Sequence, residues 1–310
     1  MGKTEPVQTS LNGILNVHKP TGMTSHDVVD AVRRAAGTKR VGHAGTLDPA
    51  AEGVLLVCVG TATRASDYLM SGTKRYRATI RFGASSTTDD REGIITDSAT
   101  PPNFAMADLI EGTTGLLGEV EQIPPTYAAI KIGGRPMYER ARSGQSVTAP
   151  ARRVRIDRID VESLESYVAT IGVVCSKGTY IRALARDLGR KLGTEAYLAA
   201  LTRTQSGRFL LEDSVSLNVV QRAGHGGYLQ RLMYPVDLAF ESWPAIVLSS
   251  TDATTIANGG SLGGAPHLSG ETLLAYDQSG RLVALLTVNE ASGRWHPTLV
   301  FTRDVLNDVA

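Results

Sequence analysis

The chain has 310 residues, 42% of them hydrophobic, and its 32 basic side chains nearly balance its 31 acidic ones. This composition predicts a folded chain with a sizeable core and excludes a disordered or fibrous protein. No apolar run approaches the roughly 20 residues that cross a membrane, and the N-terminus lacks the apolar segment of a secretory signal. Cys58 and Cys175 lie far apart in apolar stretches, which is typical of a reduced, cytoplasmic protein.

The charge is unevenly distributed along the chain. Residues 246–310 contain three basic and six acidic side chains, a net charge of −3. The remaining 29 basic and 25 acidic side chains give residues 1–245 a net charge of +4. If the chain binds a phosphate backbone, we expect its first 245 residues to make most of the contacts.

The N-terminal part begins with a polar segment, residues 1–12, which we expect to be flexible. Residues 13–17 predict a short strand. Thr24 and Asp27 have the spacing of a capping box, which predicts a helix that ends before Gly37. The apolar face of this helix is formed by Val28, Val29, Val32 and Ala36.

The next segments alternate between loop and regular structure. Residues 40–49 read as a loop, 54–59 as a buried strand and 61–70 as a helix. Residues 75–82 alternate cleanly between apolar and basic side chains, which predicts a half-buried strand. Its inward face is formed by Tyr76, Ala78, Ile80 and Phe82. Residues 84–103 are rich in Ser, Thr, Asp and Pro, which favours a long surface loop.

Further strands are predicted around residues 154–162 and 168–175, followed by a helix between Thr179 and Gly193. After Pro244, short β-like runs separated by Gly and Ser indicate a separate small β domain. Strands and helices do not alternate regularly, which favours an α+β fold with a mixed or antiparallel sheet. The expected division is therefore a flexible segment 1–12, a main domain 13–245 and a small domain 246–310.

The most informative stretch is GHAGTLDPAAEG, residues 42–53. It sets His43 and Asp48 on a glycine-rich loop between a predicted helix and a buried strand, a good way to present a rigid carboxylate to a substrate. The alternative is that Asp48 and Pro49 form an ordinary turn. The sequence contains no HExxH, GxSxG or GxGxxG motif, and we expect no metal site.

Residues 42–53 resemble the catalytic motif of the TruB family, bacterial tRNA pseudouridine synthases that act on uridine 55 of the T loop. Other stretches are similar to the remaining motifs of that family, in the same order over roughly 190 residues: His18–Ser25, Lys74–Tyr76, Ile123–Lys131 with Tyr138–Arg142, and Cys175–Arg182. Leu201 follows the last motif at the expected interval. One stretch departs from the family pattern, because residues 86–90 read STTDD where the family has Thr-Asp-Thr-x-Asp.

The resemblance implies a pseudouridine synthase fold, with a central mixed or antiparallel sheet, flanking helices and a small C-terminal β-barrel-like domain of the PUA type. It also implies an isomerase that breaks the N-glycosidic bond of a uridine in the tRNA T arm, rotates the base and rejoins it through C5. Because the product is an isomer, no cofactor is expected. The implied partner is tRNA, and the implied enzyme is a monomer that needs no membrane and no protein partner.

The resemblance assigns catalytic roles to Asp48, Arg182 and Tyr76. Asp48 would be the catalytic carboxylate, and whether it attacks the uracil ring or the ribose carbon stays open. Arg182 would hold Asp48 ionised. The residues alone instead favour a solvated helix arginine, like Arg186 and Arg190. Tyr76 would stack on the flipped base and help remove the C5 proton, although periodicity alone favours a core tyrosine.

Four further residues are assigned to substrate binding. His43 would fill the space that the flipped base leaves, unless it is a loop histidine bonded to backbone. Tyr180 and Leu201 would wall the base, or simply pack. Lys19 would position backbone or phosphate, or be an exposed loop lysine. Competing functions are a non-catalytic RNA-binding module, a guide-RNA-dependent synthase inside a multi-protein particle, and a nucleoside hydrolase.

Overall fold

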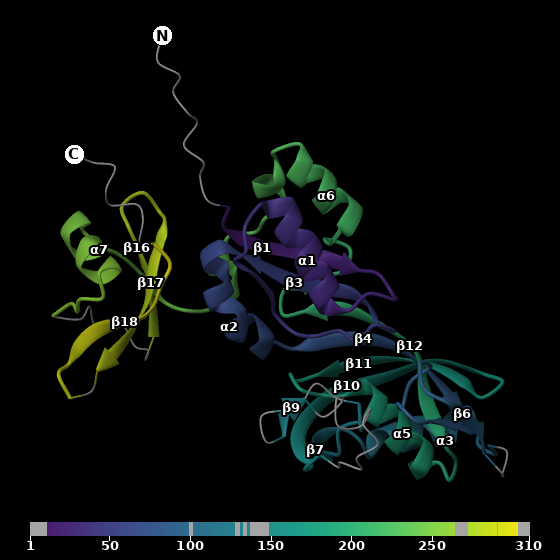
Figure 1. Ribbon diagram of the computed structural model, residues 1–310. Coiled ribbons are helices and arrows are strands. Elements are labelled where there is room, and N and C mark those ends of the chain that lie inside the picture. The colour runs from purple at the N-terminus through teal and green to yellow at the C-terminus, as the bar shows by residue number, and fades with distance from the viewer. Residues whose placement is uncertain are drawn as a thin grey trace.

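The computed structural model describes residues 11–98, 102–127, 131–132, 135–136, 149–263, 272–289 and 291–302. Within these residues the chain forms a ten-stranded sheet with flanking helices and a separate four-stranded sheet near the C-terminus (Figure 1). This arrangement confirms the predicted α+β class. In the described part of the chain, no helix is both long and apolar enough to span a membrane.

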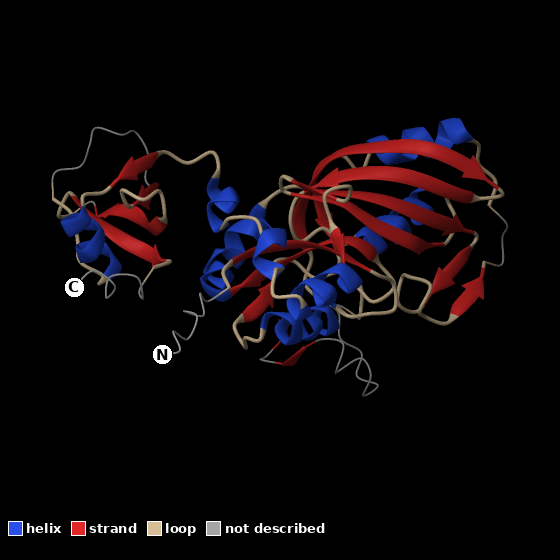
Figure 2. Ribbon diagram, turned by 90° about the horizontal axis from the view of Figure 1, so that it is seen from above, coloured by secondary structure: helices blue, strands red, loops and turns tan. Residues whose placement is uncertain are grey.

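The large sheet is mixed. Its strands are β1 (Gly13–Lys19), β2 (Val41–His43), β3 (Glu52–Val59), β4 (Lys74–Phe82), β7 (Gly118–Gln122), β10 (Arg152–Glu165), β11 (Val168–Cys175), β12 (Ala196–Ser206), β13 (Phe209–Leu210) and β14 (Val215–Ser216). The main path runs β14-β1-β3-β12-β4-β11-β10-β7, with β2 beside β3 and β13 beside β12. β12 pairs in parallel with β3 and antiparallel with β4, which joins the two halves of the sheet. Figure 2 shows the long strands side by side from above.

Helices cover the sheet in two groups. The helices are α1 (Ser25–Ala36), η1 (Gly60–Ala65), α2 (Ser66–Ser71), α3 (Met106–Thr114), α5 (Ile181–Lys191), α6 (Leu217–His225), η2 (Leu229–Leu232) and η3 (Val236–Phe240). α1 and α6 pack on β1 and β3 through a core that includes Val28, Leu55 and Val220. α3 and α5 pack on β4, β11 and β12 through a second core. The site described below lies where these halves meet.

The first helix forms where the capping signals predict it. Thr24 is the N-cap of α1, and its side chain accepts a hydrogen bond from the backbone N–H of Asp27. Asp27 accepts a hydrogen bond from the Thr24 backbone N–H in return, which completes the capping box. The helix ends at Gly37 in the left-handed conformation (φ 61°), which glycine adopts without steric cost.

The alternating segment is β4, and its burial pattern confirms the predicted inward face. Ala78, Ile80 and Phe82 are buried in the core beneath α5, and Tyr76 is partly buried against the same core. The strand predictions at 154–162 and 168–175 and the helix prediction after Thr179 are likewise confirmed by β10, β11 and α5.

Two predicted loops contain strands. Residues 41–43 of the predicted loop 40–49 form β2, which pairs with β3. The predicted loop 84–103 contains a hairpin of β5 (Ala84–Ser86) and β6 (Ile95–Asp97). The sequence of this hairpin shows no apolar alternation. Its turn is stabilised by side-chain hydrogen bonds, such as the one that Thr87 Oγ1 accepts from the Ile94 N–H at 3.0 Å.

The C-terminal sheet confirms the predicted small β unit. It contains β15 (Ala245–Val247), β16 (Thr272–Tyr276), β17 (Leu282–Asn289) and β18 (Arg294–Val300), with α7 (Ser250–Ala257) against it. Two two-residue strands, β8 (Lys131–Ile132) and β9 (Arg135–Pro136), form a separate hairpin in the main part. β15 begins one residue before the predicted domain boundary at 246.

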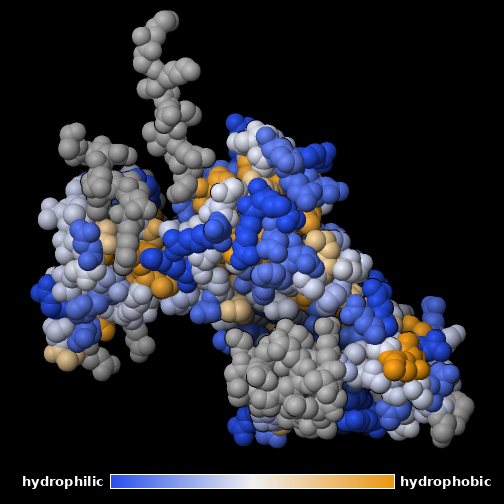
Figure 3. Space-filling view, viewed as in Figure 1, coloured by the Kyte–Doolittle hydropathy of each residue, from blue (hydrophilic) through white to orange (hydrophobic). Residues whose placement is uncertain are grey.

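An aromatic junction, which we define as Tyr68, Phe240, Trp243 and Phe301, connects the two sheets. The Tyr68 ring lies 5.0 Å from Phe240 and 5.4 Å from Trp243 between centroids, both edge-on. Phe240 and Phe301 are buried, and Leu285 of β17 packs against them. The space-filling view shows apolar surface between the two parts, while α1 is covered by hydrophilic side chains (Figure 3). Apolar packing therefore joins the C-terminal sheet to the main part.

Candidate active site

The Asp48 loop, residues 44–51 between β2 and β3, is fixed along its length by hydrogen bonds. The Leu47 N–H donates to Ser25 Oγ at 2.9 Å, and Ser25 Oγ donates back to the Leu47 carbonyl at 3.0 Å. The Gly22 N–H donates to the Pro49 carbonyl at 2.8 Å. These bonds tie the loop to the start of α1 and the turn before it. The Asp48 carboxylate is thus presented by a rigid backbone.

Lys19, at the end of β1, lies beneath this loop with no exposed surface. Its Nζ donates to the carbonyl groups of Pro20, Pro49 and Ala51 at 2.9, 3.4 and 2.6 Å. Burial lowers the Lys19 pKa to about 8, and the nearby Asp48 charge opposes that change. The alternative of an exposed loop lysine is therefore wrong. The observed contacts favour the backbone-positioning role over a phosphate contact.

Arg182, on the first turn of α5, is brought to Asp48. Its Nε lies 3.0 Å from Asp48 Oδ2, and its side chain is only 5% exposed, whereas Asp48 is 38% exposed. The guanidinium also donates from Nη1 to the Thr88 carbonyl at 3.1 Å and from Nη2 to the Tyr127 carbonyl at 3.2 Å. A solvated helix arginine is excluded by this burial. The pair leaves Asp48 with one side toward a cation and the other toward solvent.

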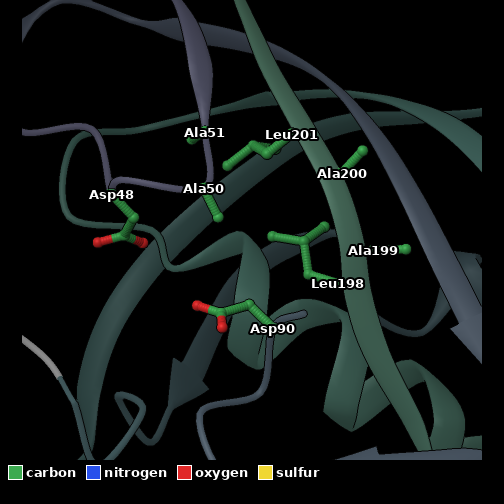
Figure 4. Close-up of a pocket in the computed structure, with 8 residues that line it drawn as sticks. All are labelled: Asp48, Ala50, Ala51, Asp90, Leu198, Ala199, Ala200 and Leu201. Carbon is green, nitrogen blue, oxygen red and sulfur yellow. The ribbon is translucent and has the colours of Figure 1, made fainter. Parts of the chain in front are cut away.

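A second carboxylate, Asp90, faces the same arginine. Its Oδ2 lies 3.4 Å from Arg182 Nη1, and its side chain is 7% exposed. Figure 4 shows the Asp48 and Asp90 side chains pointing into one small space, with Leu198 and Leu201 of β12 on its wall. Asp90 lies in the turn of the β5–β6 hairpin, in a segment whose composition predicted a surface loop. Only the family-like pattern at 86–90 singled it out, without a role.

The neighbouring pair repeats this arrangement. Asp89 has a left-handed backbone (φ 60°), and its Oδ2 lies 2.8 Å from Arg186 Nη1 on the next turn of α5. Arg186 also donates to the Ile123 carbonyl at 2.9 Å. Arg186 is therefore not a solvated arginine either, while Arg190 is 62% exposed as that alternative predicts. The two ion pairs fasten the hairpin to α5 and so hold Asp90 in place.

An open cleft of about 1060 Å³ begins at Asp48. Tyr76, Tyr180, Arg182 and Leu201 line it together with the Asp48 loop. Burial raises the pKa of both tyrosines, so both phenols are protonated at neutral pH. The Gln122 side chain fixes Tyr180 by bonding both its backbone N–H and its carbonyl, at 2.7 and 3.0 Å. Five of the seven predicted site residues thus meet at one cleft.

The remaining two predicted residues, Lys19 and His43, are not among the residues that line the cleft. His43 is partly buried at the end of β2, and burial lowers its pKa, so the ring is neutral at physiological pH. Its Nδ1 is buried and has no hydrogen-bond partner within the described residues. In the described part of the chain, His43 therefore makes no hydrogen bond to the backbone through Nδ1.

Cations surround the cleft. Its lining includes the exposed Arg152, Arg153 and Lys177 and the buried Lys74 and Arg203. Arg203 was not predicted as a site residue, although it lies in β12 two residues after Leu201. Alternation along a strand places both on one face, which is the signal that could have found it. Within the described residues, no group of three or more His, Cys, Asp or Glu could hold a metal ion.

Solved structures share this fold. A chain in the crystal structure of a Cbf5-Nop10-Gar1 complex superposes with a TM-score of 0.72, covering 97% of this chain and 88% of that one at 24% identity. A chain of the archaeal box H/ACA sRNP Nop10-Cbf5 complex gives a TM-score of 0.71 at 23% identity, covering 97% and 90% of the two chains. A sequence model described as "TruB family pseudouridylate synthase (N terminal domain)" matches residues 33–181. Fold and sequence together define a pseudouridine synthase.

The particular family follows from two further matches. A model described as "tRNA pseudouridylate synthase B C-terminal domain" matches residues 182–241. Proteins called tRNA pseudouridine synthase B are 36% identical in Levilactobacillus brevis, over 94% of this chain and 99% of that protein, and 42% identical in Staphylococcus haemolyticus, over 80% and 84%. The chain therefore belongs to the TruB family of tRNA pseudouridine synthases, isomerases that convert uridine to pseudouridine in tRNA. Of the motifs behind the predicted resemblance, residues 128–130 and 138–142 lie outside the described residues.

Proposed function

We propose that this enzyme isomerises the uridine at position 55 of the tRNA T loop, with Asp48 as the catalytic carboxylate. The observation that carries the proposal is the half-exposed Asp48, 3.0 Å from the buried Arg182, at the opening of a cleft. A carboxylate that must stay ionised needs a cation beside it, and a nucleophile must also be able to reach its substrate. Asp48 meets both requirements.

The cleft suits a nucleotide that has left its stack. Extruding a base costs a few kcal/mol and costs least in a loop, where little pairing is lost. Tyr76 and Tyr180 offer ring faces for the base, and Leu201 offers an apolar wall. His43, behind the loop, would occupy the space that the base leaves. The exposed Arg152, Arg153 and Lys177 would face the phosphates of the same strand.

The reaction then needs only groups that the chain supplies. Asp48 adds to the uracil ring or to the ribose carbon, the N-glycosidic bond breaks, and the base turns within the cleft. C5 then bonds to the ribose, the bond to Asp48 breaks again, C5 loses its proton, and N1, which has lost the ribose, gains one. We propose that the Tyr76 hydroxyl, which is protonated at neutral pH, assists this proton transfer. Proton and bond changes cancel, because the product is an isomer of the substrate.

The proposal includes an enzyme that acts alone in the cytoplasm. Cys58 and Cys175 are free and buried, and burial raises the pKa of both thiols to about 11, which fits a reducing compartment. A guide-RNA-dependent synthase would be inactive on free tRNA. A nucleoside hydrolase would release uracil, because water would intercept the cleaved sugar.

One assay tests the site and separates these alternatives. Unmodified tRNA transcript with tritium at C5 of its uridines is incubated with the purified chain, without a cofactor or guide RNA. We expect one equivalent of tritium to be released per tRNA, with no free uracil, and no release from a transcript in which uridine 55 is replaced by cytidine. Equal release from both transcripts would overturn the assignment to position 55.

A further inference from the structure

Arg203 lies where three strands of the large sheet meet. In β12 it pairs antiparallel with Tyr76 of β4 and in parallel with Gly53 of β3. β3 approaches unusually closely here, since a Cβ on Gly53 would lie 2.3 Å from the Arg203 carbonyl oxygen. Gly53 also has φ 106°, which favours glycine. The backbone at Arg203 is thus the point from which the Asp48 loop enters the sheet.

The Arg203 side chain binds the loop from below. It is 1% exposed, and its Nε donates to the Val54 carbonyl at 2.7 Å. Nη1 donates to the Thr46 carbonyl at 3.2 Å and Nη2 to the Gly45 carbonyl at 3.1 Å. These carbonyls precede and follow Asp48, so one planar group spans the loop. A lysine has no fork that could bond three carbonyls in this arrangement.

The charge on Arg203 is not neutralised by an ion pair within the described residues, unlike that of Arg182. Burying a cation without a carboxylate costs free energy that hydrogen bonds to carbonyls only partly offset. Its near neighbour is the Tyr76 hydroxyl. Burial raises the Tyr76 pKa, and the Arg203 guanidinium, through its charge and a hydrogen bond, acts in the opposite direction.

We propose that Arg203 is a positioning residue for the reaction: its guanidinium ties the carbonyl groups of Gly45 and Thr46 in the Asp48 loop to that of Val54 in β3, and keeps a positive charge beside the Tyr76 hydroxyl. This inference rests on the proposed function, in which Asp48 and Tyr76 act on the base. In this proposal Arg203 acts through the loop and through Tyr76. Its two effects are separable, because the loop requires the shape of the guanidinium whereas Tyr76 responds to its charge.

The test compares Arg203→Lys with Arg203→Met, and uses Arg190→Met, an exposed arginine on α5, as control. Lysine keeps the charge without the fork, so we expect kcat to fall about 100-fold from the displaced loop, while KM for tRNA stays within about twofold because ground-state contacts remain. Arg203→Met should reduce kcat further. Circular dichroism and thermal melting establish that each variant is folded.

The second readout is the titration midpoint of Tyr76, which would not change if Arg203 only supported the fold. With 3-fluorotyrosine in place of Tyr76, ¹⁹F NMR follows the titration of that ring alone. We expect Arg203→Met to raise the titration midpoint by about one pH unit or more, because the neighbouring cation is lost, and Arg203→Lys to leave it close to wild type. If Arg203→Met does not fold, Arg203→Gln replaces it with the same expectation.

Two results would overturn the inference. One is a kcat for Arg203→Lys within about twofold of wild type; the other is an unchanged Tyr76 midpoint in the neutral variant. Asp48→Asn serves as the reference in the same assays. If Asp48→Asn is inactive while Arg203→Lys turns over normally, the inference fails and the proposed function stands. If Asp48→Asn is fully active, the proposed function itself fails.

Discussion

The Asp48 loop and the aromatic junction solve different problems with different forces. The loop is held by Lys19, Ser25 and Arg203, which donate hydrogen bonds to its backbone carbonyls at 2.6–3.4 Å. The junction is held by the rings of Tyr68, Phe240, Trp243 and Phe301. Hydrogen bonds are directional and fix a position to a few tenths of an ångström, whereas apolar packing depends on area and shape.

This difference teaches where geometry matters. A carboxylate that acts on a substrate must be placed accurately, and a loop held by buried donors gives that accuracy at a cost in desolvation. The C-terminal sheet, in contrast, needs only to stay attached to the main part. We therefore expect changes at the loop to reduce turnover more than stability, and changes at the junction to do the reverse.

The largest effect should follow from Arg182→Met. The change removes the cation beside Asp48 and leaves Asp90 buried without its partner, so we expect turnover to fall at least about 100-fold and the free energy of unfolding to drop by about 3 kcal/mol. Single-turnover kinetics and urea unfolding measure these effects, and Arg190→Met is the control. Turnover by Arg182→Met within about twofold of the control would contradict the pairing.

Much of the fold was predictable because local signals agreed with tertiary packing. At the capping box of Thr24 and along the alternating strand β4, the local sequence and the tertiary packing favour the same structure. The β5–β6 hairpin was missed, since Ser, Thr and Asp side chains stabilise its turn and leave no apolar pattern. Arg203 was missed for a related reason: an arginine in a strand usually marks the solvent face.

The site was predictable only in part from the residues themselves. Asp48 and His43 stood out by their glycine-rich loop, but nothing local connects residue 48 with residue 182 or 203. Those contacts arise from sheet order, because β12 lies between β3 and β4 and α5 precedes it in the chain. Only the family resemblance brought Tyr76, Arg182 and Leu201 together, and the same resemblance did not assign Asp90 or Arg203.

A smaller effect on turnover, with a large effect on stability, is expected for Phe240→Ala. Phe240 is 1% exposed at the centre of the junction, and truncating a buried Phe costs about 3–5 kcal/mol. The kcat of the folded fraction should remain within about twofold of wild type, because the Asp48 loop is untouched. Calorimetry and saturating single-turnover assays make the comparison. A kcat that collapses in fully folded protein would show that the junction also sets the cleft geometry.

The smallest effect is a change in pH dependence. Because burial lowers the Lys19 pKa from 10.5 to about 8, the unfolded chain binds one more proton than the folded chain between those values. Stability then rises with pH in that window, by up to about 3 kcal/mol. Lys19→Met lacks this contribution, so wild type should gain stability over the variant from pH 8 to 10.5. If urea unfolding shows no gain in the stability of wild type relative to Lys19→Met over this pH range, the ammonium is not destabilised by burial.

The most direct test is the Asp48→Asn variant with tRNA labelled at C5 of uridine. Asparagine keeps the size of the side chain but removes the charge that faces Arg182 and the base. We predict that proton release from C5 is abolished, while the variant still binds tRNA with an affinity that weakens as salt rises. Undiminished proton release from Asp48→Asn would show that the chemistry resides elsewhere in the cleft.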